Sequence, residues 1–181
     1  MLAVAIGLCA TVTLPRAQER RAITETNLFS FVWIADPQIS PDGSQVAFVR
    51  VSADQKTDQY DTSIWLVPTA GGGSPRRISG GIRDNWPRWS PDGARLAFVR
   101  SAEQDGRVQP PQIYVMAMAG GEGRAVTTLP RGAANPAWSP DGKSIAFTSQ
   151  AFPDETEPKK LWNSFIFLTS LMRRRTSYQV V

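Results

Sequence analysis

Large apolar residues alternate with an alanine in the same way at three places along the chain, each separated by two residues from the segment Ser-Pro-Asp-Gly before it. Large apolar residues at every second position predict one face of a β-strand, with an alanine between them on the other face. The three copies are Val46-Ala47-Phe48, Leu96-Ala97-Phe98 and Ile145-Ala146-Phe147. A methyl group at the centre of one face lets a second sheet approach closely, so the pattern predicts sheets stacked face to face.

The Ser-Pro-Asp-Gly segments predict type I turns that join antiparallel strands. Proline fixes φ at the second position, aspartate tolerates the third, and glycine supplies the positive φ that follows. The turn glycines are Gly43, Gly93 and Gly142, which are 50 and 49 residues apart. One such segment is a common surface turn, but three in the same flanking pattern indicate a structural repeat.

Further short strands are predicted within each interval. They cover residues 63–67, 76–79 and 86–89 in the first interval and 113–118, 124–127 and 135–138 in the second, with polar loops at 52–62 and 101–112. Four short strands in a period of this size are typical of a propeller blade. The expected fold is therefore all-β, a partial β-propeller of about three four-stranded antiparallel blades. A β-sandwich with recurring turns is the alternative.

The segment before the first repeat allows two predictions. Thr24 can cap a short N-terminal helix with Leu28, Phe29, Val32 and Trp33 on one side. Alternatively, residues 31–34 form a strand.

Four regions are expected along the chain: a signal peptide at 1–17, a lead-in at 18–36, propeller repeats at 37–160 and an atypical tail at 161–181. Residues 1–14 are apolar but short for a bilayer span, and Ala17 offers a cleavage site, so export to the periplasm or the exterior is expected. A disordered leader or a misplaced start codon is the alternative.

The tail does not continue the repeat. Leu161-Trp162 stands where the next strand of the third blade is expected to start. The residues after it do not continue the repeat and include Arg173-Arg174-Arg175. One hypothesis is a truncated or frame-shifted gene product. The other is a genuine short protein in which residues 165–172 form a helix or touch a membrane.

Charge argues against a nucleic-acid partner. The formal net charge of the 181 residues is +4, but residues 18–158 carry 14 Lys and Arg against 16 Asp and Glu. The excess positive charge lies outside that range, and no basic face for a phosphate backbone is predicted. Cys9, the one cysteine, lies in the leader, so neither a disulfide nor thiolate chemistry is expected of the mature chain.

No catalytic, cofactor-binding or metal-binding residue is predicted, and substrate-binding residues cannot be named. The sequence contains no histidine to act as base for a serine, and no Gly-x-Ser-x-Gly elbow. Gly71-Gly72-Gly73 is interpreted as a turn and not a phosphate loop. The carboxylates Asp54, Asp58 and Asp61 lack the spacing of a calcium loop, and Glu155 and Glu157 are interpreted as part of a polar loop.

The tryptophans are interpreted mainly as packing residues. Trp89 and Trp138 occupy the same position of the repeat, where Ile39 stands in the first copy, and Trp65 aligns with Tyr114. Large apolar rings at one repeated position predict that they pack in the core of the blades.

The repeats resemble those of TolB-type, WD-like propellers, and the segment from Asn27 to Gly43 resembles the start of the propeller in the prolyl oligopeptidase family of serine peptidases. The resemblance covers residues 24–149 and points to the acylaminoacyl-peptidase and dipeptidyl-peptidase type. It implies a propeller that controls access to an α/β-hydrolase domain, where a Ser-Asp-His triad cleaves short peptides. None of the triad positions can be assigned to this chain.

The expected function is thus that of a non-catalytic propeller fragment of an exported serine peptidase. A stand-alone TolB-like binding or scaffold module of the periplasm is the alternative. Peptide substrates or a protein are the expected partners. Self-association is also expected, because about three blades leave terminal faces uncovered.

Overall fold

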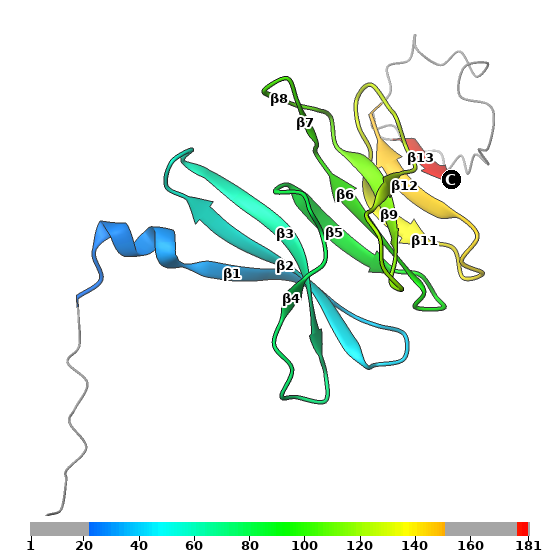
Figure 1. Cartoon of the computed structure of the whole chain (residues 1–181). Coiled ribbons are helices and arrows are strands. Elements are labelled where there is room, and N and C mark those ends of the chain that lie inside the picture. Colours follow the sequence, from blue (N-terminus) through cyan, green and yellow to red (C-terminus); the bar gives the residue numbers. More distant parts are fainter. Residues whose placement is uncertain (1–21, 151–176, 181) are drawn as a thin grey trace, which may run out of the picture.

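The computed structural model describes residues 22–150 and 177–180, which form three antiparallel blades side by side and one small two-stranded sheet (Figure 1). Blade 1 contains β1 (Val32–Ile39), β2 (Gln45–Asp54), β3 (Gln59–Pro68) and β4 (Arg76–Arg77), in that spatial order. Blade 2 contains β5 (Asp84–Trp89), β6 (Arg95–Arg100), β9 (Gln112–Ala117) and β10 (Arg124–Ala125). Blade 3 contains β11 (Ala134–Trp138), β12 (Ile145–Ser149) and β13 (Ser177–Val180). The predicted all-β fold of four-stranded antiparallel blades is confirmed, and the sandwich alternative is wrong.

Blade 3 is described by three strands, of which β13 pairs with β12 from Ser149↔Ser177 to Ala146↔Val180. The strand predicted to begin at Leu161-Trp162, the leader and the expected boundaries at residues 17 and 160 all lie outside the described residues. The tail hypotheses therefore remain predictions.

The N-terminal lead-in combines both predicted conformations. Residues Glu25–Ser30 form the 3-10 helix η1, and the backbone N–H of Thr24 donates to Oδ1 of Asn27 at 2.9 Å. The prediction that the helix extends to Val32 and Trp33 was wrong. Both residues belong to β1, where they pair with Ser52 and Val51 of β2. Their backbone N–H and C=O groups thus find hydrogen-bond partners in the sheet and need no longer helix.

Both predicted polar loops contain strand. β2 and β3 stay paired as far as Asp54↔Gln59, so the expected loop at 52–62 shrinks to the four residues between these strands. The loop at 101–112 contains a small hairpin of β7 (Glu103–Gln104) and β8 (Arg107–Val108). The polar composition of these segments wrongly predicted loops. An exposed hairpin needs no apolar face, because the hydrogen bonds between its two backbones hold it together.

Neighbouring blades pack the alanine face of one sheet against the large apolar face of the next, as predicted. One buried cluster joins Ala47, Ile64 and Leu66 of blade 1 to Leu96, Phe98 and Met116 of blade 2. A second cluster joins Ala97, Val99, Ile113 and Val115 of blade 2 to Ala133, Ile145 and Phe147 in or beside blade 3. Ala47 and Ala97 are fully buried at these two contacts, where a larger side chain would hold the sheets apart.

The three Ser-Pro-Asp-Gly turns share one hydrogen-bond pattern. The N–H of each turn glycine donates to the carbonyl of the turn serine, and the glycines have φ of 72°, 69° and 67°, which confirms the predicted turn. The aspartate adds a feature that the sequence did not reveal. In the first turn its Oδ1 accepts from the Ser40 hydroxyl at 2.6 Å and from the N–H of Ser44 at 3.1 Å. The other two turns repeat both bonds.

An indole N–H links each blade to the blade before it. Nε1 of Trp89 donates to the carbonyl of Gln38 at 3.0 Å, and Nε1 of Trp138 donates to the carbonyl of Arg88 at 3.0 Å. Both rings also pack against the buried clusters. The predicted packing role of the two tryptophans is confirmed, and the structure adds a directional bond to it.

A buried ion pair is specific to blade 2. Asp84 in β5 is completely buried and accepts two hydrogen bonds from Arg100 in β6, at 2.7 and 2.9 Å. The bond to Asp84 raises the pKa of the Arg100 guanidinium above its ordinary value. Ile34 and Ala133 stand at the position of Asp84 in the other two blades. The pair therefore distinguishes the middle blade from its neighbours.

Gly93→Ala is expected to lower the free energy of unfolding by about 1 kcal/mol. An added Cβ would lie 3.6 Å from Cδ of Pro41, an ordinary contact, so the cost comes from the positive φ. Ala94→Ser next to it is the control and should leave stability nearly unchanged. Equal urea midpoints for the two variants would contradict the turn assignment.

Asp42→Asn should reduce stability more at pH 5 than at pH 2. Hydrogen bonds from Ser40 and then from Ser44 lower the pKa of Asp42 from 3.8 to about 2. Stability from this carboxylate is thus present above the unfolded pKa and is lost as the pH falls through about 2. Urea unfolding of wild type and variant at both pH values gives the difference. A stability gap of the same size at both pH values would refute the turn bonds.

Trp138→Phe is expected to cost about 1 kcal/mol, because it keeps an aromatic ring but removes the donor to the Arg88 carbonyl. Trp86→Phe serves as the control, since Trp86 is 42% exposed. Chemical unfolding followed by circular dichroism measures both. Similar losses in the two variants would mean that the indole bond adds nothing to stability.

Candidate functional site at the inner strands

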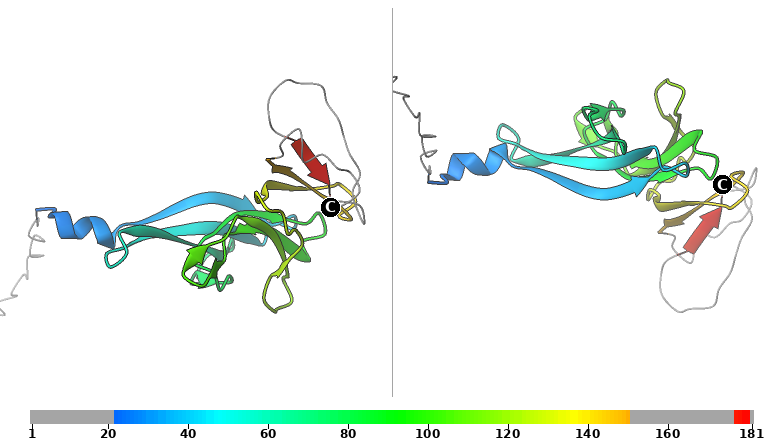
Figure 2. Two further views of the ribbon diagram at one scale, coloured as in Figure 1. Left: turned by 90° about the horizontal axis from the view of Figure 1, so that it is seen from above. Right: turned by 90° about the horizontal axis from the view of Figure 1, so that it is seen from below.

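The first strands of the blades converge on one side of the described structure. β1 contacts β5 and β5 contacts β11, whereas β4 and β10, the last strands of blades 1 and 2, do not contact each other. Figure 2 shows the structure from above and below, with η1 at one end and blade 3 at the other. In a propeller the convergent strands surround the central channel. This inner side is consequently the surface on which a ligand would meet several blades at once.

Each inner strand is interrupted by a bulge at the residue before its proline. Asp36, Trp86 and Asn135 have φ of 46°, 58° and 54°, and the strand register shifts at each of them. Positive φ is uncommon for residues with a side chain and is especially strained for tryptophan. The repeat therefore imposes the same unusual backbone at three successive positions along the inner side.

The first two bulges form a small polar and aromatic cluster. Nη1 of Arg88 lies 2.8 Å from Oδ2 of Asp36, and Nε2 of Gln38 donates to Oδ1 of the same carboxylate at 2.7 Å. The Arg88 guanidinium also lies 5.7 Å from the centre of the Trp86 ring. About a quarter of the Asp36 and Arg88 side chains is exposed, at 28% and 27%. A ligand in the channel would thus meet an ion pair with a partly open indole beside it.

At the third bulge the cluster is replaced by neutral groups. Asn135 donates from Nδ2 to the Thr148 hydroxyl at 2.8 Å, and Ala137 stands at the position of Arg88. The surface changes along the inner side from charged and aromatic to uncharged. Such a surface can bind a peptide through hydrogen bonds and ring contacts. The sequence has no histidine, so these side chains do not include a serine–histidine pair.

The residues considered from sequence for metal or phosphate binding do not assemble into a site. Asp54 ends β2, Asp58 lies in the following turn with φ of 52°, and Asp61 lies in β3. Across residues 22–150 and 177–180, no three potential metal ligands converge. The Gly71-Gly72-Gly73 turn connects β3 to β4 as predicted. Glu155 and Glu157 lie outside the described residues.

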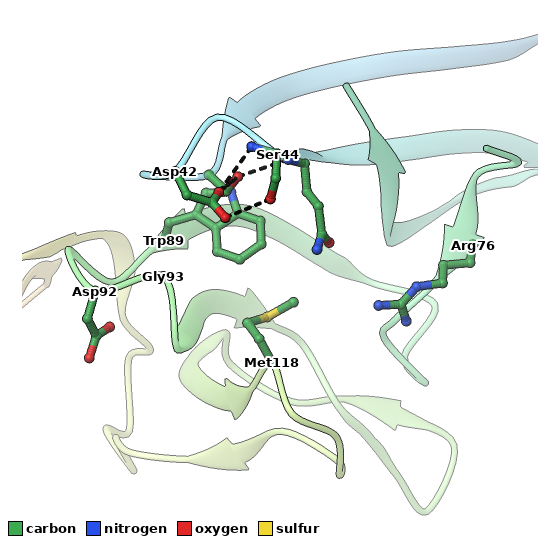
Figure 3. A pocket seen from close by; sticks show the side chains of 9 residues that line it. Asp42, Ser44, Arg76, Trp89, Asp92, Gly93 and Met118 are labelled. Atoms are coloured by element: carbon green, nitrogen blue, oxygen red, sulfur yellow. Dashed lines mark hydrogen bonds between the residues drawn. The ribbon is translucent and has the colours of Figure 1, made fainter. Parts of the chain in front are cut away.

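Three hollows in the described part of the chain lie away from the inner side. One is a mainly apolar recess of about 290 Å³ between η1 and the β2–β3 hairpin, lined by Leu28, Phe29, Trp33, Ala53, Asp58, Gln59 and Tyr60. The second is a cavity of about 140 Å³ between the turns of blades 1 and 2 (Figure 3). The third, of about 250 Å³, shares Ser44, Gln45 and Arg76 with it. Within the described segments there is no helix whose length and hydropathy would suit a membrane crossing.

Sequence reasoning missed the inner-strand cluster, although its signal was present. A residue before proline at the same offset from each turn marks all three bulges. Their positive φ could not be read from that signal, because pre-proline residues favour extended backbone.

Residues 14–156 match the family model for the TolB beta propeller domain. The uncharacterized peptidase YuxL of Bacillus subtilis (strain 168) is 41% identical over 117 residues, which cover 65% of this chain and 17% of that protein. The chain therefore spans less than a fifth of this curated relative.

Solved structures show the same fold. Pyrococcus horikoshii acylaminoacyl peptidase matches with a TM-score of 0.57 and 21% identity, over 72% of this chain and 19% of its own. The β-propeller domain of the Trilobed protease from Pyrococcus furiosus matches with a TM-score of 0.53 and 22% identity, over 66% of this chain and 35% of its own. Since the family model covers most of the sequence, and the blades have the expected strand order, the chain belongs to the TolB β-propeller domain family.

Proposed function

We propose that this chain forms the first blades of the propeller of a serine peptidase of the prolyl oligopeptidase family, and that its role there is not catalytic. The observation that carries the proposal is the 41% identity to a peptidase that is much longer than the matched segment. The resemblance of residues 27–43 to the start of such propellers supports the same assignment.

In this proposal the inner strands contact peptide substrates on their way to a hydrolase domain. The Asp36–Arg88 pair with Trp86 offers hydrogen bonds to peptide groups and a partly exposed ring to an apolar side chain. Bond cleavage requires a nucleophile, a base and donors to the developing oxyanion. A hydrolase domain outside this chain supplies these groups in the proposed enzyme.

Export of the protein is part of the same proposal. It rests on the apolar residues 1–14 and on Ala17 as the cleavage site before Gln18. Self-association of the isolated chain is proposed from the uncovered outer face of blade 1, where Ile34 and Ile39 are 67% and 64% exposed.

A stand-alone TolB-like binding module is the second candidate. The family match supports it, because the matched model describes the propeller and not a peptidase. In that case the inner strands bind a protein partner, and no hydrolase domain takes part.

A chimera separates the two candidates. Residues 27–149 replace the matching segment of the Bacillus subtilis relative, and aminoacyl and dipeptidyl chromogenic substrates are assayed. The chain alone is expected to leave all of them intact, whereas the chimera is expected to keep the activity of its parent. Arg88→Ala in the chimera should raise KM several-fold, with little change in kcat, if the inner strands contact substrate.

Three outcomes count against the peptidase assignment or against the substrate contact that it includes. The first is a folded chimera without activity, in an assay where the parent is active. The second is an Arg88→Ala chimera with unaltered kinetic constants, since this removes the proposed substrate contact. The third is turnover by the isolated chain that a serine-directed phosphonate blocks, because the proposed role excludes catalysis by these residues.

A further inference from the structure

We propose that the cavity between the turns of blades 1 and 2 binds the guanidinium group of an arginine side chain from outside this chain. The proposal does not depend on a peptidase function. It rests on a comparison of two junctions that the repeat builds in the same way.

The two junctions share their backbone geometry. An ideal Cβ on Gly93 would lie 3.6 Å from Cδ of Pro41 in the preceding turn, and the same atom on Gly142 would lie 3.5 Å from Cδ of Pro91. Each junction also has an indole fixed by its N–H to the preceding inner strand, at 3.0 Å in both cases. The position of the ring relative to the preceding blade is therefore set by the same bond in both.

The junctions differ in what covers the indole. Between blades 2 and 3, the Arg95 guanidinium lies 4.7 Å from the centre of the Trp138 ring and donates from Nη2 to the Gly142 carbonyl at 2.7 Å. Gln45 stands at the position of Arg95 in blade 1. A glutamine side chain is shorter and uncharged, so it cannot provide the cation–π contact that Arg95 makes.

The cavity of about 140 Å³ lies where the arginine is missing. Gln45, Trp89 and Gly93 line it, which are the counterparts of Arg95, Trp138 and Gly142. Figure 3 shows the indole of Trp89 in the middle of the cavity wall, with the Asp42 carboxylate above it and Met118 below. The volume is several times that of one water molecule and accommodates a planar guanidinium.

The charge of the walls suits a cation. Asp42 and Asp92 both line the cavity, and hydrogen bonds from the turn serines lower the pKa of each. Both carboxylates are ionised at neutral pH. A guanidinium can stack on the indole face while the N–H groups in its own plane donate to oxygen acceptors around it. An ammonium group cannot do this.

Arg76 is the cationic residue on the wall. It lies on the exposed strand β4, and Figure 3 shows its guanidinium across the cavity from Trp89. Its positive charge opposes a second cation. Arg76→Gln is therefore expected to strengthen binding of an external guanidinium.

The test compares wild type with Gln45→Arg, which closes the cavity, and Arg95→Gln, which opens the second junction. The probe is N-acetyl-arginine amide, and N-acetyl-citrulline amide is its uncharged control. At about five times Kd the arginine probe should raise the Tm of wild type by about 2–4 °C. The rise should be absent in Gln45→Arg and larger in Arg95→Gln. Citrulline should produce no rise in any of the proteins.

Two further measurements keep the test decisive if Arg95→Gln does not fold. Gln45→Arg should raise Tm without any probe, whereas Gln45→Met, with similar length and no charge, should not. Saturation-transfer NMR should detect the probe's Cδ protons with wild type and not with Gln45→Arg. Free arginine should compete with the amide, since the side chain is the recognised group.

Equal probe-induced shifts in wild type and Gln45→Arg would overturn the proposal, because general effects of arginine on stability act on both. A response seen only in Arg76→Gln would also overturn it. In that case Arg76 itself occupies the cavity in solution, and no external side chain is needed.

Discussion

The hydrogen bond from an indole to the carbonyl of the preceding inner strand fixes how each blade sits on the one before it. Its acceptor is a backbone atom, so the bond is independent of the side chain at that position, which is glutamine in blade 1 and arginine in blade 2. Burial of apolar surface between the alanine face of one blade and the large apolar face of the next holds the blades together, but this attraction does not fix their relative orientation. The indole bond adds the direction, and the contacts between successive turns follow from it.

Features that depend on a few neighbouring residues could be predicted from the sequence. Pro-Asp-Gly restricts backbone angles within one turn, so the positive φ of Gly93 follows from local sterics. Alternation of Leu96, Ala97 and Phe98 determines which side chains share a face. Recurrence at a fixed interval then turns these local predictions into an architecture, because each unit must cover its neighbour.

The partners within the inner-strand cluster and within the ion pair of blade 2 could not be predicted, because they are distant from one another in sequence. Arg88 meets Asp36 only after two blades have packed, and Asp84 meets Arg100 only across a strand pair. The left-handed backbone of Trp86 goes against local preference and persists because surrounding contacts hold it. Sequence indicates where the repeat places a residue, but not which residue of the next blade will face it.

The indole bonds have a consequence for strand addition. β1 and β5 are each the terminal strand of their sheet, and a terminal strand with free peptide groups is a template on which a strand of another chain can pair. Trp89 and Trp138 engage a carbonyl on β1 and β5 and place a bulky ring beside it. The tryptophan of each following blade thereby obstructs intermolecular β-pairing on the strand before it.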